Sequence, residues 1–234
     1  MTGATSERTG PVWRVYPDAE ALATQLTQTV LNEARDRIEQ HGRFMLVLAG
    51  GATPRRVYLK LAQAAADWGR WHIWFGDERC YPLGHSERND TMAQDALLTR
   101  VPIPRDNIYP ICSEGFGPEA AARRYAEVLP QGGFDLTLLG LGEDGHTASL
   151  FPGNNWGETD ESAAVLPVLN APKPPAERVS LSAHRLSQSV KVIFLVTGAG
   201  KANAVARWKT GEALPASAIH APKLEVWLDQ AAAT

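Results

Sequence analysis

A histidine and two carboxylates share a glycine-rich segment, LGLGEDGHTASLFPG at residues 139–153, which follows an apolar run. His146 has a side chain that titrates near neutral pH. A carboxylate at Asp144, two residues earlier, can hold the orientation of the imidazole and raise its basicity, as a general base requires. A histidine that only bonds within its own loop is the structural alternative. The closeness of Asp144 favours the catalytic interpretation.

Paired glycines in a second loop could bind an anion. Gly50 and Gly51 follow an apolar run and precede Thr53, which can cap the next helix, and Pro54 suits the first turn of that helix. A glycine turn at a helix N-terminus can hold a phosphate monoester with backbone N–H groups. A tight turn without a ligand is the alternative, and this motif alone leaves both open.

Charged side chains follow another apolar run at residues 76–79, GDER. Charges after a strand are often only solvated. Asp77 and Arg79, however, stand where the binding loops of an α/β sheet should lie, which favours a site. Asn89 could cap a helix that begins near Thr91, or it could enter the same pocket.

Two more cations, Lys201 and Arg178, lie where predicted helices or strands begin. Lys201 lies in TGAGKAN, residues 197–203, at the expected start of a helix. A full P-loop fails there, because Leu195 replaces its first glycine and Ala202 replaces the hydroxyl that binds magnesium. A compact ammonium beside helix amides still suits a single phosphate group. Arg178, at the start of an expected strand, could supply another phosphate contact.

Several other chemistries are disfavoured by the sequence. Gly140, Gly142 and Gly145 match GxGxxG, but Pro152 leaves little room for the helix that a dinucleotide site needs. Ser149 lacks the GxSxG context of a serine nucleophile. No HExxH or comparable ligand spacing is present, so we expect no catalytic metal.

Alternating helices and apolar strands would position these loops. Apolar residues at every fourth position predict a helix from Asp18 that Gly42 closes. Strands are predicted at 44–49, 71–76, 108–111, 136–141 and 191–197, and helices at 55–66, 119–128 and 202–209. This alternation predicts an α/β fold, with three α/β/α layers around a doubly wound, mostly parallel, Rossmann-like sheet. Ligands of such sheets bind beyond the carboxyl ends of the strands.

Composition and charge set the broad class. The 234 residues, 44% of them apolar, predict a single domain over 1–234, with the proline-rich segment 169–177 as a surface loop. A net charge of -3 from interspersed charges gives no general attraction to nucleic acid or to a membrane. Two cysteines in unrelated contexts and a polar segment at residues 1–10 predict an unexported, cytoplasmic protein.

Five segments, taken in order along the chain, resemble the 6-phosphogluconolactonase family. They are GGATP, GDER, the segment 139–153, the Arg178 segment and GAGKANA. This family belongs to a wider fold group with glucosamine-6-phosphate deaminases and ribose-5-phosphate isomerases. The resemblance covers the chain from residue 44 to its end. It implies hydrolysis of 6-phospho-D-glucono-1,5-lactone to 6-phospho-D-gluconate, the second step of the oxidative pentose phosphate pathway, with no cofactor.

The resemblance also implies roles for individual residues. His146 would be the general base on water, supported by Asp144, while Arg79 and Lys201 would contact the anionic substrate and Asp77 would belong to the same pocket. Gly50, Gly51 and Thr53 would bind the phosphate or the sugar, with Arg178 as a further partner. Ala49 and Ala52 stand where lactonases commonly have serines. Transient association with glucose-6-phosphate dehydrogenase, which makes the lactone, stays an open question.

Two alternatives remain at this point. Deaminases of the same group share the glycine turn and the histidine loop, but they typically carry an acid where this chain has Phe151 and a tyrosine where it has Arg79. Both differences favour lactone hydrolysis. The second alternative is a sugar-phosphate sensor, in which Asp144 and His146 only order a loop.

Overall fold

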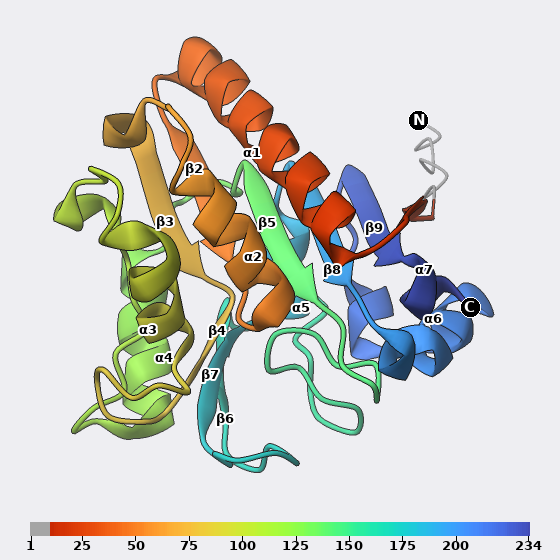
Figure 1. Ribbon diagram of the computed structural model, residues 1–234. Helices are drawn as coiled ribbons and strands as arrows, with labels where there is room; N and C mark the ends of the chain where they lie inside the picture. The colour runs from red at the N-terminus through yellow and green to blue at the C-terminus, as the bar shows by residue number, and fades with distance from the viewer. Residues whose placement is uncertain (1–9) are drawn as a thin grey trace, which may run out of the picture.

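A six-stranded parallel sheet forms the centre of the structure, a computed structural model that describes residues 10–234 (Figure 1). The polar segment from which we predict an unexported protein falls almost entirely outside these residues. The strand order is β1-β9-β8-β5-β2-β3. The strands are β1 (Val12–Tyr16), β2 (Phe44–Leu48), β3 (Trp71–Phe75), β5 (Leu136–Gly140), β8 (Lys191–Val196) and β9 (Lys223–Asp229).

Helices cover both faces of this sheet, as the alternating pattern predicts. Figure 1 shows α1 and α2 in front of the sheet and α5 behind it. The helices are α1 (Ala19–His41), α2 (Ala52–Leu61), α3 (Asn89–Ala93), α4 (Gly117–Val128), α5 (Ala183–Ser187), α6 (Ala202–Lys209) and α7 (Gln230–Ala233). The predicted three-layer, doubly wound α/β fold is confirmed.

The first helix begins and ends where the sequence predicts. The Asp18 carboxylate accepts hydrogen bonds from the amides of Glu20 and Ala21, at 2.9 and 2.8 Å, and so caps α1. Gly42 ends the helix with a left-handed φ of 74°. The stripe from Leu22 to Ala34 is buried against the sheet, which explains why the four-residue spacing was informative.

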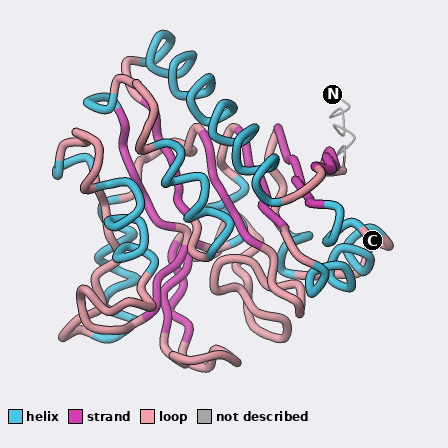
Figure 2. The backbone as a smooth tube through the Cα atoms, viewed as in Figure 1, coloured by secondary structure: helices cyan, strands magenta, loops and turns pink. Residues whose placement is uncertain are grey.

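A second sheet lies at the carboxyl ends of the central strands. It is antiparallel and contains β4 (Asp77–Arg79), β7 (Arg178–Leu181) and β6 (Val165–Val168), in that order. The sequence predicts the strand at Arg178, but its interpretation of GDER as a loop is wrong, because these residues pair with β7. Figure 2 shows the long loops gathered around this sheet, below the lower ends of the parallel strands.

The predicted strand at 108–111 is also wrong. Only an isolated bridge joins Ile108 to Ile73 on the edge strand β3. Pro110 has no N–H group to continue a ladder, so the pairing stops there. Trp68, Trp71 and Trp74, which lie in or just before β3, are buried in the core.

The end of β9 is tied to the loop that carries Lys201. Both carboxylate oxygens of Asp229 lie 3.0 Å from the amide of Gly198, and one of them caps α7 by accepting the amide of Ala232 at 2.8 Å. One buried side chain therefore holds two chain segments together.

We predict that Asp229→Ala lowers the free energy of unfolding by about 1–3 kcal/mol, because both amides lose their acceptor. Urea denaturation followed by circular dichroism measures the change. Asp36→Ala is the control, since Asp36 is exposed on α1 and, among residues 10–234, forms an ion pair only with Arg35, at 3.6 Å. Equal losses in the two variants would contradict the assigned role of Asp229.

Candidate active site

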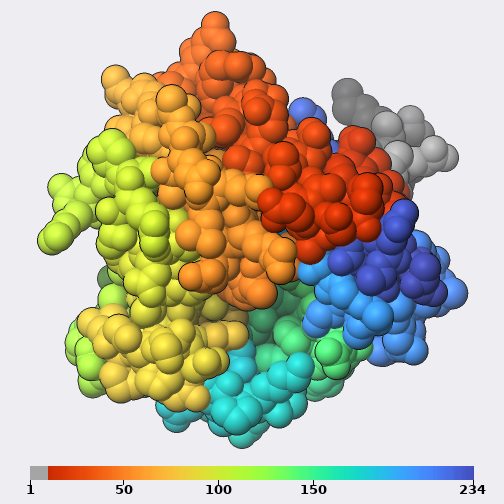
Figure 3. All heavy atoms as spheres, in the orientation of Figure 1, coloured from red at the N-terminus to blue at the C-terminus, as the bar shows by residue number. Residues whose placement is uncertain are grey.

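A pocket of about 440 Å³ opens at the carboxyl ends of β2, β3, β5 and β8. Figure 3 shows the surface hollowed in this region, below the orange spheres of α2. The pocket receives nine of the ten candidate residues: Gly50, Gly51, Thr53, Asp77, Arg79, Asn89, His146, Arg178 and Lys201. Asp144 does not line the pocket but bonds to His146 from behind. The four motif segments, one of which is the strand β4, therefore come together as the sheet rule predicts.

Asp144 and His146 form a short hydrogen-bonded pair. Nδ1 of His146 lies 2.5 Å from a carboxylate oxygen of Asp144, which also accepts the amide of His146 at 3.2 Å. Because a carboxylate only accepts, Nδ1 carries the proton, and Nε2 is the nitrogen with a free lone pair. Burial lowers the pKa of His146 below its ordinary value of 6.5, and the charge of Asp144 opposes this shift. The imidazole is therefore neutral at pH 7.

The glycine at position 142 makes room for this pair. A Cβ atom on Gly142 would lie 1.9 Å from Nδ1 of His146 and 2.6 Å from the carboxylate of Asp144. The loop closes through a hydrogen bond of 2.7 Å from the Gly142 amide to the His146 carbonyl. Gly142 of the GxGxxG match thus serves close packing, and no helix lies between β5 and β6 in the described chain.

The glycine turn after β2 begins α2 earlier than the sequence predicts: the N-cap lies two residues before Thr53, and the helix covers Ala52–Leu61 in place of 55–66. Gly51, with φ of 107°, is the N-cap, so Thr53 already lies inside the helix and does not cap it. The hydroxyl of Thr53 bonds instead to that of Thr197, at 2.6 Å. Tyr58 secures the turn from below, because its hydroxyl bonds both to the amide and to the carbonyl of Ala49, each at 2.9 Å.

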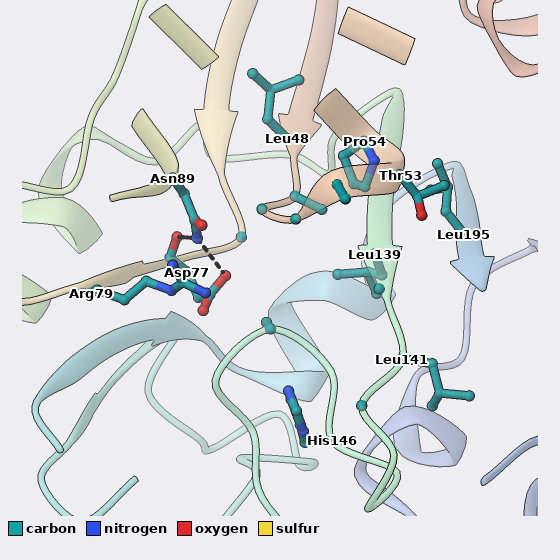
Figure 4. A pocket seen from close by; sticks show the side chains of 18 of the residues that line it. Leu48, Thr53, Pro54, Asp77, Arg79, Asn89, Leu139, Leu141, His146 and Leu195 are labelled. Atoms are coloured by element: carbon teal, nitrogen blue, oxygen red, sulfur yellow. Dashed lines mark hydrogen bonds between the residues drawn. The ribbon is translucent and has the colours of Figure 1, made fainter. Parts of the chain in front are cut away.

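Asn89 supports the pocket without capping its helix. Its side-chain amide donates to the carbonyl of Asp77 at 2.9 Å and to the carboxylate at 3.1 Å, as the dashed lines of Figure 4 show. A Cβ atom on Gly50 would lie 1.9 Å from the Asn89 side chain. Glycine at position 50 therefore allows the turn and Asn89 to meet. The other oxygen of Asp77 accepts the hydroxyl of Ser149 at 2.5 Å, so this serine is engaged in structure.

Positive charge dominates the pocket. Arg79, Lys173, Arg178 and Lys201 line it, and in the described part of the chain none of these four forms an ion pair with a carboxylate. Arg79 and Arg178 are direct partners across the β4–β7 ladder, although like charges repel there. Burial lowers the pKa of Arg178, and Arg79 adds to this effect. A bound anion would offset both the repulsion between the two arginines and the cost of burying the charge of Arg178.

Sequence reasoning missed Lys173. It lies in the proline-rich segment 169–177, which forms a loop as expected but borders the pocket. The available signal was a lysine five residues before Arg178, within a segment that its prolines stiffen. It also missed Thr197, and it used Phe151 only to distinguish this chain from the deaminases. The Phe151 ring packs on His146 with 4.7 Å between centroids.

Among residues 10–234, no group of three or more His, Cys, Asp or Glu side chains could hold a metal ion. Helices long and apolar enough to span a bilayer are also absent from this range. Fold and site together define an α/β protein with a cation-lined pocket at the carboxyl edge of its parallel sheet.

Comparisons with known proteins agree with this class. Residues 17–228 match the family model of glucosamine-6-phosphate isomerases/6-phosphogluconolactonase. A chloroplastic 6-phosphogluconolactonase of Arabidopsis thaliana is 36% identical, over 94% of this chain and 74% of that protein. The 6-phosphogluconolactonase of Mycobacterium leprae is 32% identical, over 92% and 93%. The chain belongs to the glucosamine-6-phosphate isomerase/6-phosphogluconolactonase family.

A solved structure extends the likeness to three dimensions. The crystal structure of a 6-phosphogluconolactonase from Thermotoga maritima matches with a TM-score of 0.84 and 28% identity, over 94% of this chain and 99% of that one. The family resemblance that the ordered motifs suggest is thus confirmed.

We predict that Gly142→Ala breaks the hydrogen bond between His146 and Asp144 because the added methyl group occupies the place of Nδ1. Nuclear magnetic resonance of ¹⁵N-labelled histidine would show loss of the strongly shifted Nδ1 proton. Gly140→Ala is the control, since a Cβ atom there meets nothing within 4 Å. A retained Nδ1 signal in Gly142→Ala would contradict the geometry.

Proposed function

We propose that this chain hydrolyses 6-phospho-D-glucono-1,5-lactone to 6-phospho-D-gluconate, the second step of the oxidative pentose phosphate pathway. The observation that carries the proposal is the neutral imidazole of His146, held by Asp144 at the wall of a cationic pocket. The named lactonases among its relatives support the same reaction.

The phosphate group would bind between the N-terminus of α2 and Lys201. The hydrogen bond between Thr53 and Thr197 joins these two loops, so amides of the first helical turn and the ammonium converge on one place. Figure 4 shows Thr53 and His146 on opposite sides of the pocket. A substrate with its phosphate at α2 would therefore extend toward the histidine, where C1 of the lactone would react.

His146 would accept a proton from water through Nε2 as the water oxygen attacks C1. The pair of electrons of the carbonyl bond moves onto its oxygen. Asp144 and Asp77 both raise the pKa of His146, so both carboxylates stabilise the imidazolium that forms. The intermediate then collapses, the bond between C1 and the ring oxygen breaks, and the imidazolium returns its proton to that oxygen. The carboxylic acid product ionises in water.

Phe151 favours hydrolysis over the deaminase alternative. Its ring fills the position beside His146 where the deaminases of this group typically place an acid, so ring opening of an amino sugar lacks that proton donor. Arg79 instead adds a cation near a substrate that carries negative charge.

Free Cys80 and Cys112 support the proposed cytoplasmic location. Association with glucose-6-phosphate dehydrogenase stays a prediction, and a pull-down between the two purified proteins tests it.

We predict that His146→Ala lowers kcat by about 10²–10⁴-fold, the usual contribution of a general base. The measurement is hydrolysis of freshly generated lactone above its spontaneous rate. His220→Ala is the matched control, because His220 is exposed and its side chain makes no hydrogen bond within the described residues. Normal turnover by the His146→Ala variant would show that His146 is not the general base. If the native protein gave no acceleration, glucosamine 6-phosphate would be tested next, and ligand binding without turnover would indicate a sensor.

The pH profile provides a separate prediction. Because the neutral imidazole is the active form and burial lowers its pKa, kcat/KM should fall as the pH is lowered, with a midpoint below the ordinary histidine value of 6.5. Asp144→Asn removes an anion that raises this pKa, so the midpoint should move further down and the plateau should also fall. A midpoint that rises in Asp144→Asn would contradict the assignment.

A further inference from the structure

Arg178 is a buried cation that bonds to the backbone of its own loop. Its Nε donates to the carbonyl of Pro175 at 3.2 Å, and its Nη2 donates to the carbonyls of Lys173 and Pro174 at 3.0 and 3.1 Å. Two of its three nitrogens are thus committed to these carbonyls. An arginine bonded in this way fixes the path of the loop, which leaves it less suited to be a primary phosphate contact.

The segment that Arg178 fixes carries Lys173 to the edge of the pocket. The Lys173 side chain is exposed and, within the described chain, forms no ion pair. Pro174 and Pro175 follow directly, and their fixed φ angles limit the conformations of the loop. The ammonium of Lys173 is therefore held near the pocket by its backbone while it stays available to a ligand.

Arg178 also connects this loop to the histidine. Its guanidinium carbon lies 5.4 Å from the centroid of the Phe151 ring, and the same ring packs on His146 at 4.7 Å. Arg178, Phe151 and His146 thus contact one another in series. Of the cations in the pocket, Lys173 has the largest effect on the pKa of His146, which it lowers. Because Arg178 bonds to the carbonyl of Lys173 at 3.0 Å and also contacts Phe151, which packs on His146, Lys173 lies at the histidine end of the pocket.

We propose that Lys173 is a further catalytic residue, whose ammonium faces the carbonyl oxygen at C1, and that Arg178 is the positioning residue that holds it there. This inference rests on the proposed lactone hydrolysis. When water attacks C1, the electron pair moves onto the carbonyl oxygen, and Lys173 stabilises that negative charge. When the bond to the ring oxygen breaks, the pair returns to the carbonyl. The ammonium keeps its proton throughout.

The first test separates the reacting carbonyl from the phosphate. We expect Lys173→Met to lower kcat by about 10²–10³-fold, the usual cost of removing a donor to an oxyanion. KM, and the inhibition constant of inorganic phosphate, should stay close to native. Lys173→Arg should recover part of the rate, because it keeps the charge. Lys223→Met is the control, since Lys223 is exposed at the start of β9, and the pocket lies at the other, carboxyl ends of the parallel strands.

Three outcomes overturn parts of the argument in distinguishable ways. A raised KM and a raised phosphate inhibition constant with unchanged kcat would assign Lys173 to the phosphate. Native kinetics in Lys173→Met would leave this residue no role. Absence of hydrolysis by the native protein would overturn the proposed function itself, whereas the first two outcomes leave that function intact.

The second test concerns Arg178. If Arg178 acts through Lys173, Arg178→Met should lower kcat in the native background and add little in the Lys173→Met background. Independent, multiplying losses would contradict the positioning role. Arg178→Lys repeats the test if the methionine variant does not fold, because lysine keeps the charge but loses the planar fork that reaches three carbonyls.

Discussion

The parallel pairing of β2 with β5 in the middle of the sheet is the constraint on which the site depends. It is short, and it joins Leu46 to Leu136 and Val47 to Thr137. Beyond it the chain leaves in two directions: α2 leads to β3 on one side, and the loop after β5 leads, through the small sheet, to β8 on the other. Because these connections diverge, a crevice opens between them. The glycine turn forms one wall and His146 the other.

The pocket opposes the charge of the whole chain. The protein carries a formal charge of -3, yet four cations and a helix N-terminus converge at one edge of its sheet. The positive electrostatic potential of this group of cations attracts a small anion that comes close to it. The rest of the surface does not attract larger polyanions. The like-charged pair of Arg79 and Arg178 is unfavourable without a ligand. Part of the energy of binding therefore comes from neutralising repulsion that the fold has already built in.

The sequence was most informative where one residue type had one physical consequence. Asp18, Gly42 and the four-residue apolar stripe predicted α1 correctly, and the buried runs predicted four of the parallel strands. Those runs end where glycine turns begin. The position of the site therefore followed from the rule that ligands bind beyond the carboxyl ends of parallel strands. The pairing of Asp144 with His146 was also accessible, because both residues belong to one short loop.

The remainder depends on long-range pairing that local patterns do not encode. GDER becomes a strand only because β7, a hundred residues later, lies beside it. Thr53 resembles a cap in isolation, but its hydroxyl meets Thr197 from another loop. Lys173 belongs to a segment whose composition is typical of a surface loop, and Arg178 determines where that loop goes. The edge strand β1 and its neighbour β9 were missed because the sequence interpretation assigned no apolar run to them.

The hydroxyl pair of Thr53 and Thr197 has a consequence for the protonation state of the ligand. Two hydroxyl groups carry two hydrogens, and the bond between them uses one. The other hydrogen remains available, and both side chains line the pocket. Together with the amides and the ammonium of Lys201, the pair offers donors to a group that only accepts. A phosphate that has lost both of its acidic protons satisfies them all, whereas a singly protonated one brings a hydrogen that must find an acceptor. This end of the pocket is therefore matched to a dianion.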